Sequence, residues 1–224
     1  MKKYPVLLGA LSLAALLSFS FTPATKNAAD KPAVTAVAAA NLKVNTQAST
    51  MKWNAKKVGG EHYGTINLAD GALQLNGNKL TGGNFTIDMR SIVVQDITRA
   101  ESNKKLTDHL KSDDFFSVEN HPKATFTITK VGRLTKAKAG EPNYNVTGNL
   151  TIKGITNQIT FPATVKVTGK SAEATALIEV DRTKYDIKYR SGMMGTAADK
   201  IIYDNFTIDL KLVADAGTNT AESK

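Results

Sequence analysis

Apolar and polar residues alternate along most of this chain. In Asn84–Arg90, for example, Phe85, Ile87 and Met89 occupy every second position, with polar or charged residues between them. Successive side chains of a strand point to opposite faces, so a period of two predicts strands with one buried and one wet face. Many such strands joined by turn residues predict an all-β fold, either an antiparallel sandwich or a barrel.

Ten segments are expected to form strands, and one is expected to form a helix. The helix is predicted at Asn103–Ser112, with Ser102 as its N-cap and with Leu106 and Leu110 on one face. Turns are predicted at glycine-containing pairs, among them a hairpin at Asp70-Gly71. The expected strands are Leu42–Asn45, Ser49–Ala55, Glu61–Leu68, Ala72–Leu75, Phe85–Val94, Ala124–Val131, Asn143–Lys153, Gln158–Val167, Glu173–Val180 and Asn205–Val213, and the other expected turns include Asn76-Gly77-Asn78, Gly82-Gly83, Lys153-Gly154 and Thr168-Gly169.

The two ends of the chain differ from the alternating part. Residues 1–24 have two lysines, an uncharged apolar run at Val6–Phe21 and then small residues, which is the order of a secretory signal peptide. That run is shorter than the roughly 20 residues that a membrane-spanning helix needs. Residues 25–41 are predicted to be a flexible linker, residues 42–213 one folded domain and residues 214–224 a polar, disordered tail. The chain has no cysteine for lipid attachment or disulfides, so we expect a periplasmic or secreted protein that is not membrane-spanning.

The chain is basic, with 29 Lys and Arg against 20 Asp and Glu and a formal net charge of +9. The positive charges are spread along the sequence and form no arginine-rich block interleaved with aromatic residues. The pattern therefore does not indicate nucleic-acid binding. It favours a solvated basic surface, with anionic lipid headgroups as a partner that such a surface could meet.

The chain has few residues with catalytic potential. It has no cysteine and no Gly-x-Ser-x-Gly turn for a serine nucleophile, and no glycine-rich phosphate loop. Asp108, His109 and Asp113 are of the residue types that bind divalent metals, but their spacing fits no defined site. We expect no catalytic residue, no metal and no cofactor, and keep a metal-dependent hydrolase around these three residues as an alternative.

The apolar positions suggest a different role. A closed barrel of about eight strands can hold packed side chains or one small ligand. Ala172, Ala174 and Ala176 would leave space on the inner face where larger residues would fill it. The residues expected to line the interior are Trp53, Phe85, Ile87, Met89, Phe115, Phe116, Phe126, Ile128, Gly148, Leu150, Ile152, Phe161, Ala174, Phe206 and Ile208.

Several segments together resemble the YceI-like family of exported lipocalin-like proteins. They are Lys105–Phe116, His121–Phe126, Val146–Thr156 and Asp181–Ile187, and they occur in the family's order. The resemblance implies an antiparallel eight-stranded lipocalin-like barrel with one short inserted helix near Leu106.

The resemblance also implies an apolar tunnel for a polyisoprenoid, an isoprenoid quinone or a fatty-amide-type lipid. We expect its polar headgroup to meet Arg182, Lys184 or Arg190 at a rim of the barrel. A stress-related interaction module with a filled core is a second alternative to a lipid carrier. The sequence does not decide the oligomeric state, and a homodimer stays open.

Overall fold

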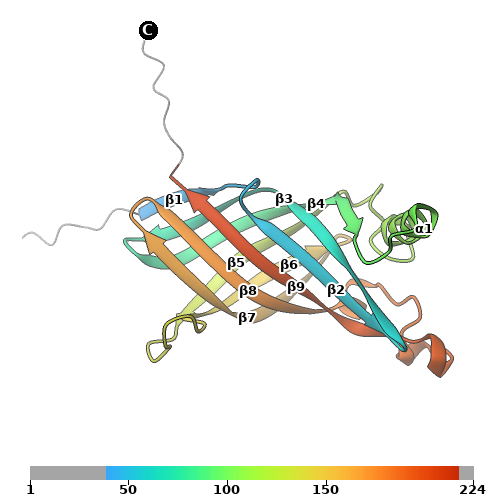
Figure 1. Cartoon of the computed structure of the whole chain (residues 1–224). Coiled ribbons are helices and arrows are strands. Elements are labelled where there is room, and N and C mark those ends of the chain that lie inside the picture. The colour runs from blue at the N-terminus through green and yellow to red at the C-terminus, as the bar shows by residue number, and fades with distance from the viewer. Residues whose placement is uncertain (1–38, 217–224) are drawn as a thin grey trace, which may run out of the picture. The chain divides into compact units, whose positions relative to one another are not determined.

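The computed structural model describes residues 39–216, which form nine strands, one α-helix and three short 3-10 turns (Figure 1). The expected signal peptide, most of the expected linker and most of the expected tail lie outside the described residues. The elements are β1 (Ala39–Val44), β2 (Thr50–Lys57), β3 (Gly60–Asn76), β4 (Lys79–Val94), α1 (Ala100–Lys111), β5 (Lys123–Arg133), β6 (Tyr144–Ile152), β7 (Ile155–Thr168), β8 (Ser171–Asp181), η1 (Arg182–Tyr185), η2 (Gly192–Met194), η3 (Ala198–Lys200) and β9 (Ile202–Asp215).

The strands close into one antiparallel barrel. Each strand from β3 to β9 pairs with the next, β9 pairs with β2, and β2 pairs with β3, so eight strands complete a ring. Strand β1 pairs with the far end of β3 and with the end of β9, on the same side as β2. β1 and β2 therefore occupy the same place in the barrel wall, between β3 and β9, one after the other along its length. The expected eight-stranded barrel is confirmed.

The alternating pattern places every second side chain inside. In β6, Tyr144, Val146, Gly148, Leu150 and Ile152 are all buried, and the residues between them are exposed or half-buried. The tight turn after β6 consists of Lys153 and Gly154, both with positive φ, as a two-residue hairpin turn with the twist of its strands requires.

Two expected turns lie inside strands. Asp70-Gly71 is in the middle of β3 and Gly82-Gly83 is in β4, so the prediction of a hairpin at Asp70-Gly71 is wrong. The pairing of β3 with β4 shifts between Leu68 and Asp70, which marks a bulge in a continuous strand. A Cβ on Gly71 would lie 2.8 Å from the Phe85 ring, so a glycine is needed there for close packing.

The helix begins earlier than expected and without the expected cap. Arg99 is the N-cap and makes no side-chain cap hydrogen bond, so the assignment of Ser102 as the cap is wrong. Asn103 instead fixes the start of α1, because its side-chain amide donates to the carbonyls of Val94 and Ile97 at 2.9 Å each. Leu106 and Leu110 pack against the barrel core as predicted.

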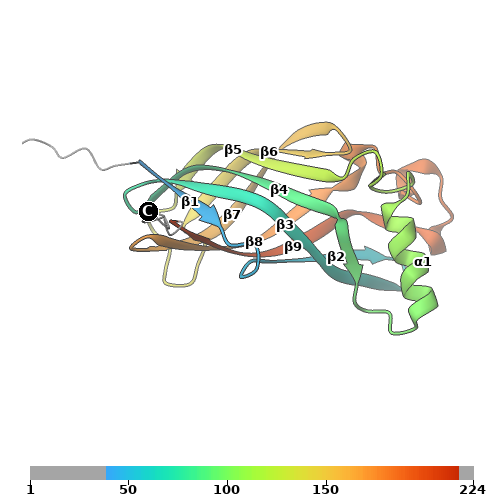
Figure 2. The ribbon, with the colours of Figure 1, turned by 90° about the horizontal axis from the view of Figure 1, so that it is seen from above.

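The two ends of the barrel are built differently (Figure 2). One end carries the β3–β4 and β7–β8 turns and β1. The other end, which we call the helix end, carries α1 and the segment between β8 and β9. Within the helix end, contacts join α1 and the segment after it to the segment between β8 and β9. The ring centres of His109 and Tyr189 lie 4.7 Å apart, and Lys153 donates to the carbonyls of both Asp113 and Asp186.

Candidate functional site

The interior of the barrel contains two apolar cavities. Counting only the space open to the centre of a water-sized sphere, they measure about 110 and 130 Å³. The first cavity lies between the middle of the barrel and the β3–β4 turn, and the second lies toward the helix end. Five residues border both cavities, so the cavities adjoin: Met51, Ile87, Leu150, Val180 and Ile208.

Fourteen of the fifteen predicted lining residues border one or both cavities. Ala174 and Ala176 face the first cavity, and Ala55 faces the second. Ile128 and Ile178 point inward but are only half-buried, which is expected of side chains that border empty space. Small side chains on β8 therefore leave room that leucine or phenylalanine would fill.

Gly148 is the exception, because it borders neither cavity. A Cβ on this residue would lie 2.4 Å from the ring of Phe126 and 2.6 Å from the carbonyl oxygen of Thr127. The glycine thus makes room for the Phe126 ring, which forms part of the cavity wall and lies tilted against the Phe161 ring, with 5.5 Å between the ring centres. Gly148 faces inward on β6 as predicted, but the Phe126 ring separates it from the cavities.

Packed side chains fill the end of the barrel at the β3–β4 turn. Leu42, Leu75 and Ala172 are buried there and border neither cavity. The Tyr144 hydroxyl, on β6, accepts a hydrogen bond from the backbone N–H of Leu80, on β4, so its ring reaches past β5. The first cavity therefore ends against a plug of side chains.

At the helix end, the cavity wall comes from α1 and from loops as well as from strands. Leu110, Phe115 and Phe116 contribute from α1 and the segment after it. Ile187 and Ile202 contribute from the connection between β8 and β9. Access to the interior is thus more readily changed at this end, where the wall is not held by a continuous strand ladder.

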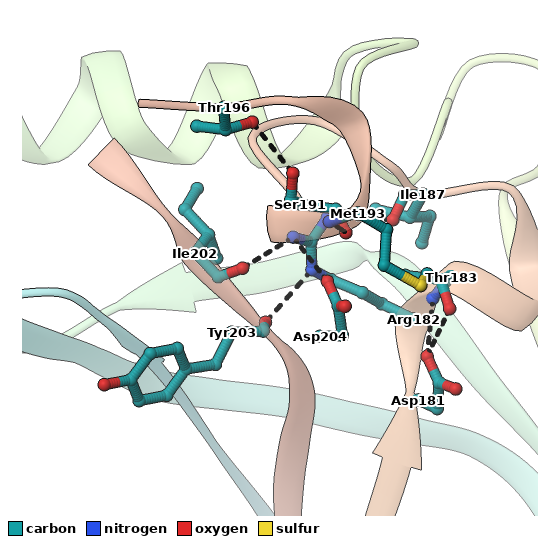
Figure 3. Close-up of polar contacts among 10 residues, drawn as sticks. All are labelled: Asp181, Arg182, Thr183, Ile187, Ser191, Met193, Thr196, Ile202, Tyr203 and Asp204. Carbon is teal, nitrogen blue, oxygen red and sulfur yellow. Dashed lines mark hydrogen bonds and ion pairs between the residues drawn. The ribbon is translucent and has the colours of Figure 1, made fainter. Parts of the chain in front are cut away.

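Arg182 is the buried cation of the helix end, and Figure 3 shows its contacts. Its guanidinium donates to the backbone carbonyls of Tyr203, Ile187 and Ile202 at 3.1, 2.8 and 2.9 Å. It also pairs with Asp204 at 3.3 Å. The residue is 4% exposed and borders the second cavity, so it lies inside the wall of the helix end rather than on its surface, and its predicted contact with a headgroup stays a prediction. Its main contacts hold the start of β9 against η1.

The charges around Arg182 are consistent with a structural cation. Burial lowers the pKa of Arg182, and the carboxylates of Asp204 and Asp181 oppose that shift. An arginine nevertheless stays protonated in proteins, so a positive charge persists beside the second cavity. Nearby, burial raises the pKa of Tyr185 to about 12, and its hydroxyl has no hydrogen-bond partner within residues 39–216.

Lys184 and Arg190 are exposed at the helix end. The Arg190 guanidinium lies 5.2 Å from the ring centre of Tyr189. Their predicted role toward a headgroup stays a prediction.

The three residues of the hydrolase alternative make separate contacts. Asp108 pairs with Lys104 at 2.6 Å, Asp113 accepts from Ser117, and His109 contacts Asp114 at 2.9 Å. Among residues 39–216 no group of three or more His, Cys, Asp or Glu side chains is placed to hold a metal ion. No observation therefore favours the hydrolase alternative.

Comparison with known proteins agrees with this architecture. Residues 42–214 match the YceI-like domain. The chain belongs to the YceI-like domain family. A UPF0312 protein of Pectobacterium carotovorum is 33% identical over 150 residues, which cover 66% of this chain and 65% of that relative. The chain thus spans about 65% of the length of the first curated relatives it matches.

Two solved structures share the fold of this YceI-like domain. Burkholderia cenocepacia BcnA has a TM-score of 0.54 at 24% identity, over 76% of this chain and 99% of that one. A polyisoprenoid binding domain from Saccharophagus degradans has a TM-score of 0.53 at 15% identity, over 78% of this chain and 98% of that one. At these identities the likeness shows the fold alone.

Sequence reasoning missed part of the YceI-like interior. Met51, Leu68, Ile178 and Leu210 all border the cavities and were not among the predicted lining residues. Each stands two positions from another inward residue of its strand, so the alternation contained the signal. The prediction had already placed Trp53 of β2 and Ala174 of β8 on the inner face, so the same alternation would have added Met51 and Ile178.

Proposed function

We propose that this YceI-like domain binds the long apolar part of a lipid inside its barrel and carries it without catalysing a reaction. The proposed ligand is a polyisoprenoid chain, with isoprenoid quinones and fatty amides as related candidates. The proposed setting is the periplasm or the extracellular space. The observation that carries the proposal is the pair of adjoining cavities with apolar walls.

The energetics of such a site favour long chains. Each methylene group removed from water contributes about 0.8 kcal/mol, so affinity rises with the length of chain that the cavities accommodate. Pockets of this type orient a ligand with few polar groups and take most of the affinity from apolar contact. The name of the Saccharophagus degradans domain, a polyisoprenoid binding domain, supports the same ligand class.

The test is to fill the first cavity. Replacing Ala174 and Ala176 by phenylalanine should occupy the space beside β8 and abolish uptake of a polyprenol or a long-chain fatty amide. Leu177→Phe is the matched control, because Leu177 directly follows Ala176 on β8 and its side chain is 65% exposed on the outside. Extraction and mass identification of lipid that copurifies from the host would provide the ligand.

Circular dichroism of both variants must match that of the unmodified protein, so that lost binding is not lost folding. Binding that survives in the doubly filled barrel would refute the proposal. So would consistent absence of lipid from host-purified protein together with no uptake of either probe.

A further inference from the structure

Beyond the ligand cavity, the loop 191–201 at the helix end has features of a membrane-contacting element. It leaves the barrel after Arg190 and returns at Ile202, and the N–H of Ile202 donates to the carbonyl of Arg190 at 2.9 Å. The N–H of Val58, in the β2–β3 turn, donates to the carbonyl of Ile201 at 2.9 Å. The loop is therefore a compact excursion with its ends joined.

A buried serine fixes the conformation of this loop (Figure 3). Ser191 is fully buried, and its hydroxyl accepts a hydrogen bond from the N–H of Met193 at 3.3 Å. Its carbonyl accepts from the N–H of Met194 at 3.1 Å and from the hydroxyl of Thr196 at 2.8 Å. The turn that carries the two methionines is thus held in one shape.

This fixed turn exposes two consecutive apolar side chains. Met193 is 72% exposed and Met194 is 62% exposed. Tyr203 and Val58, on segments joined to the loop, are 51% and 39% exposed. Isolated exposed apolar residues are ordinary, but a group of them on one ordered projection is typical of an interaction site. Methionine in particular adapts its shape to varied apolar surroundings.

Exposed basic side chains lie on the same connection as the methionines and at the β2–β3 turn that is hydrogen-bonded to it. Lys184, Arg190 and Lys200 are exposed on the same connection, and Lys57 is exposed next to Val58. The same connection has two acidic residues: Asp186, which pairs with Lys188 at 2.8 Å, and Asp199, which is exposed. Apolar side chains within a basic rim match the surface of a bilayer that contains anionic lipids.

We propose that the 191–201 loop docks the protein on such a bilayer, with Met193 and Met194 entering the boundary between headgroups and acyl chains. Lys184, Arg190, Lys200 and Lys57 contact the lipid phosphates. The docked loop adjoins Ile187 and Ile202, which border the second cavity, so the helix end faces the lipid phase. This proposal goes beyond ligand binding and does not require an occupied cavity.

The first experiment measures association with vesicles. Protein in the form its host produces is sedimented with vesicles of phosphatidylcholine alone or with a third of phosphatidylglycerol. We expect binding to the anionic vesicles, loss of it in high salt, and a loss of roughly tenfold or more in Met193→Asp/Met194→Asp. Leu177→Asp is the matched control, because it changes an equally exposed apolar residue on the barrel wall and should leave binding unchanged.

The second experiment locates the contact. The chain has no cysteine, so Met194→Cys gives a single position for an environment-sensitive fluorophore. Anionic vesicles should shift its emission to the blue, whereas the same label at Leu134→Cys, in the loop at the opposite end of the barrel, should not respond. A water-like signal at position 194, equal binding to neutral vesicles, or full binding by the double aspartate variant would overturn the proposal.

The two proposals fail in different experiments. The double aspartate variant should still take up a polyprenol from solution, because its cavity is unchanged. The Ala174→Phe/Ala176→Phe variant should lose that uptake but still sediment with anionic vesicles. A loop that serves a protein partner instead would give no response to vesicles in either assay.

Discussion

At the scale of single residues, two positions determine how this barrel is held together and what its interior can contain. Arg182 fastens the start of β9, because one guanidinium satisfies three backbone carbonyls and a carboxylate. Gly148 makes room for the Phe126 ring, whose position shapes the first cavity. The sequence indicated both positions but not these contacts, which depend on residues far away along the chain.

Replacing Arg182 by methionine should lower the free energy of unfolding by about 3 kcal/mol or more. A buried acceptor left without its donor costs about 1–3 kcal/mol, and three carbonyls would lose theirs. Arg182→Lys should recover only part of the loss, because a single ammonium group cannot replace the planar guanidinium. Urea denaturation measures the change, and Lys184→Met, at an exposed neighbour, should lie within about 0.5 kcal/mol of the unmodified protein.

Gly148→Ala should destabilise the barrel by about 1–3 kcal/mol, because the added methyl group overlaps the Phe126 ring and the Thr127 carbonyl. Gly60→Ala is the matched control, since a Cβ at Gly60 meets no atom within 4 Å. Thermal or urea unfolding of the pair provides the comparison. Equal stability of the two variants would show that the packing of the Phe126 ring does not require a glycine at position 148.

At the scale of elements, the side chain of one residue, Asp96, fixes the connection between β4 and α1. Asp96 lies in this connection and accepts hydrogen bonds from the His62 ring at 2.7 Å and from the N–H of Tyr63 at 3.1 Å. Burial raises the pKa of Asp96, but the hydrogen bonds from His62 and Tyr63 together lower it by more. The pKa of Asp96 therefore lies below the ordinary value of 3.8. The carboxylate thereby holds the segment that follows β4 against β3.

This contact predicts a dependence of stability on acid. The folded-state pKa of Asp96 is below its unfolded value, so the stabilisation is fully present above about pH 4 and is lost as pH falls through the folded pKa. Asp96→Asn should cost about 1.5 kcal/mol at pH 7, and the difference from the unmodified protein should shrink below pH 4. Asp70→Asn, at an exposed position, is the control. A difference independent of pH would contradict this account.

At the scale of the whole molecule, side chains fill one end of the barrel, adjoining cavities lie in the middle, and α1 and the β8–β9 connection wall the helix end. Within residues 39–216, no helix is long and apolar enough to span a bilayer. The second cavity and the loop proposed to touch a membrane both lie toward the helix end. Together the two proposals predict that a lipid passes between bilayer and barrel with little exposure to water.

Ligand binding should stabilise the whole barrel. A ligand that binds the folded state alone, at 100 times its dissociation constant, adds about 2.7 kcal/mol. For a domain of this size that raises Tm by about 5–10 °C. Differential scanning calorimetry with and without a polyprenol tests this, and the Ala174→Phe/Ala176→Phe variant should show no shift. A similar rise in that variant would place the binding outside the first cavity.

The sequence by itself determined the strand content, the antiparallel class and most of the inward positions. Period-two alternation depends only on the geometry of a strand, and that geometry is the same wherever the strand lies. Fourteen of the fifteen predicted lining residues therefore border the cavities. The family resemblance added the closed eight-stranded form, which alternation alone left open against a sandwich.

The remaining features of the barrel depend on what lies opposite each residue after the barrel closes, so only the tertiary structure decided them. Asp70-Gly71 has the composition of a hairpin turn, yet pairing with Thr86 and Phe85 of β4 keeps it within a continuous strand, directly after a bulge. Arg182 has the composition of a surface cation, yet the carbonyls of a segment 20 residues away bury it. Small residues on β8 leave a hollow only because no larger side chain from the opposite wall reaches into it.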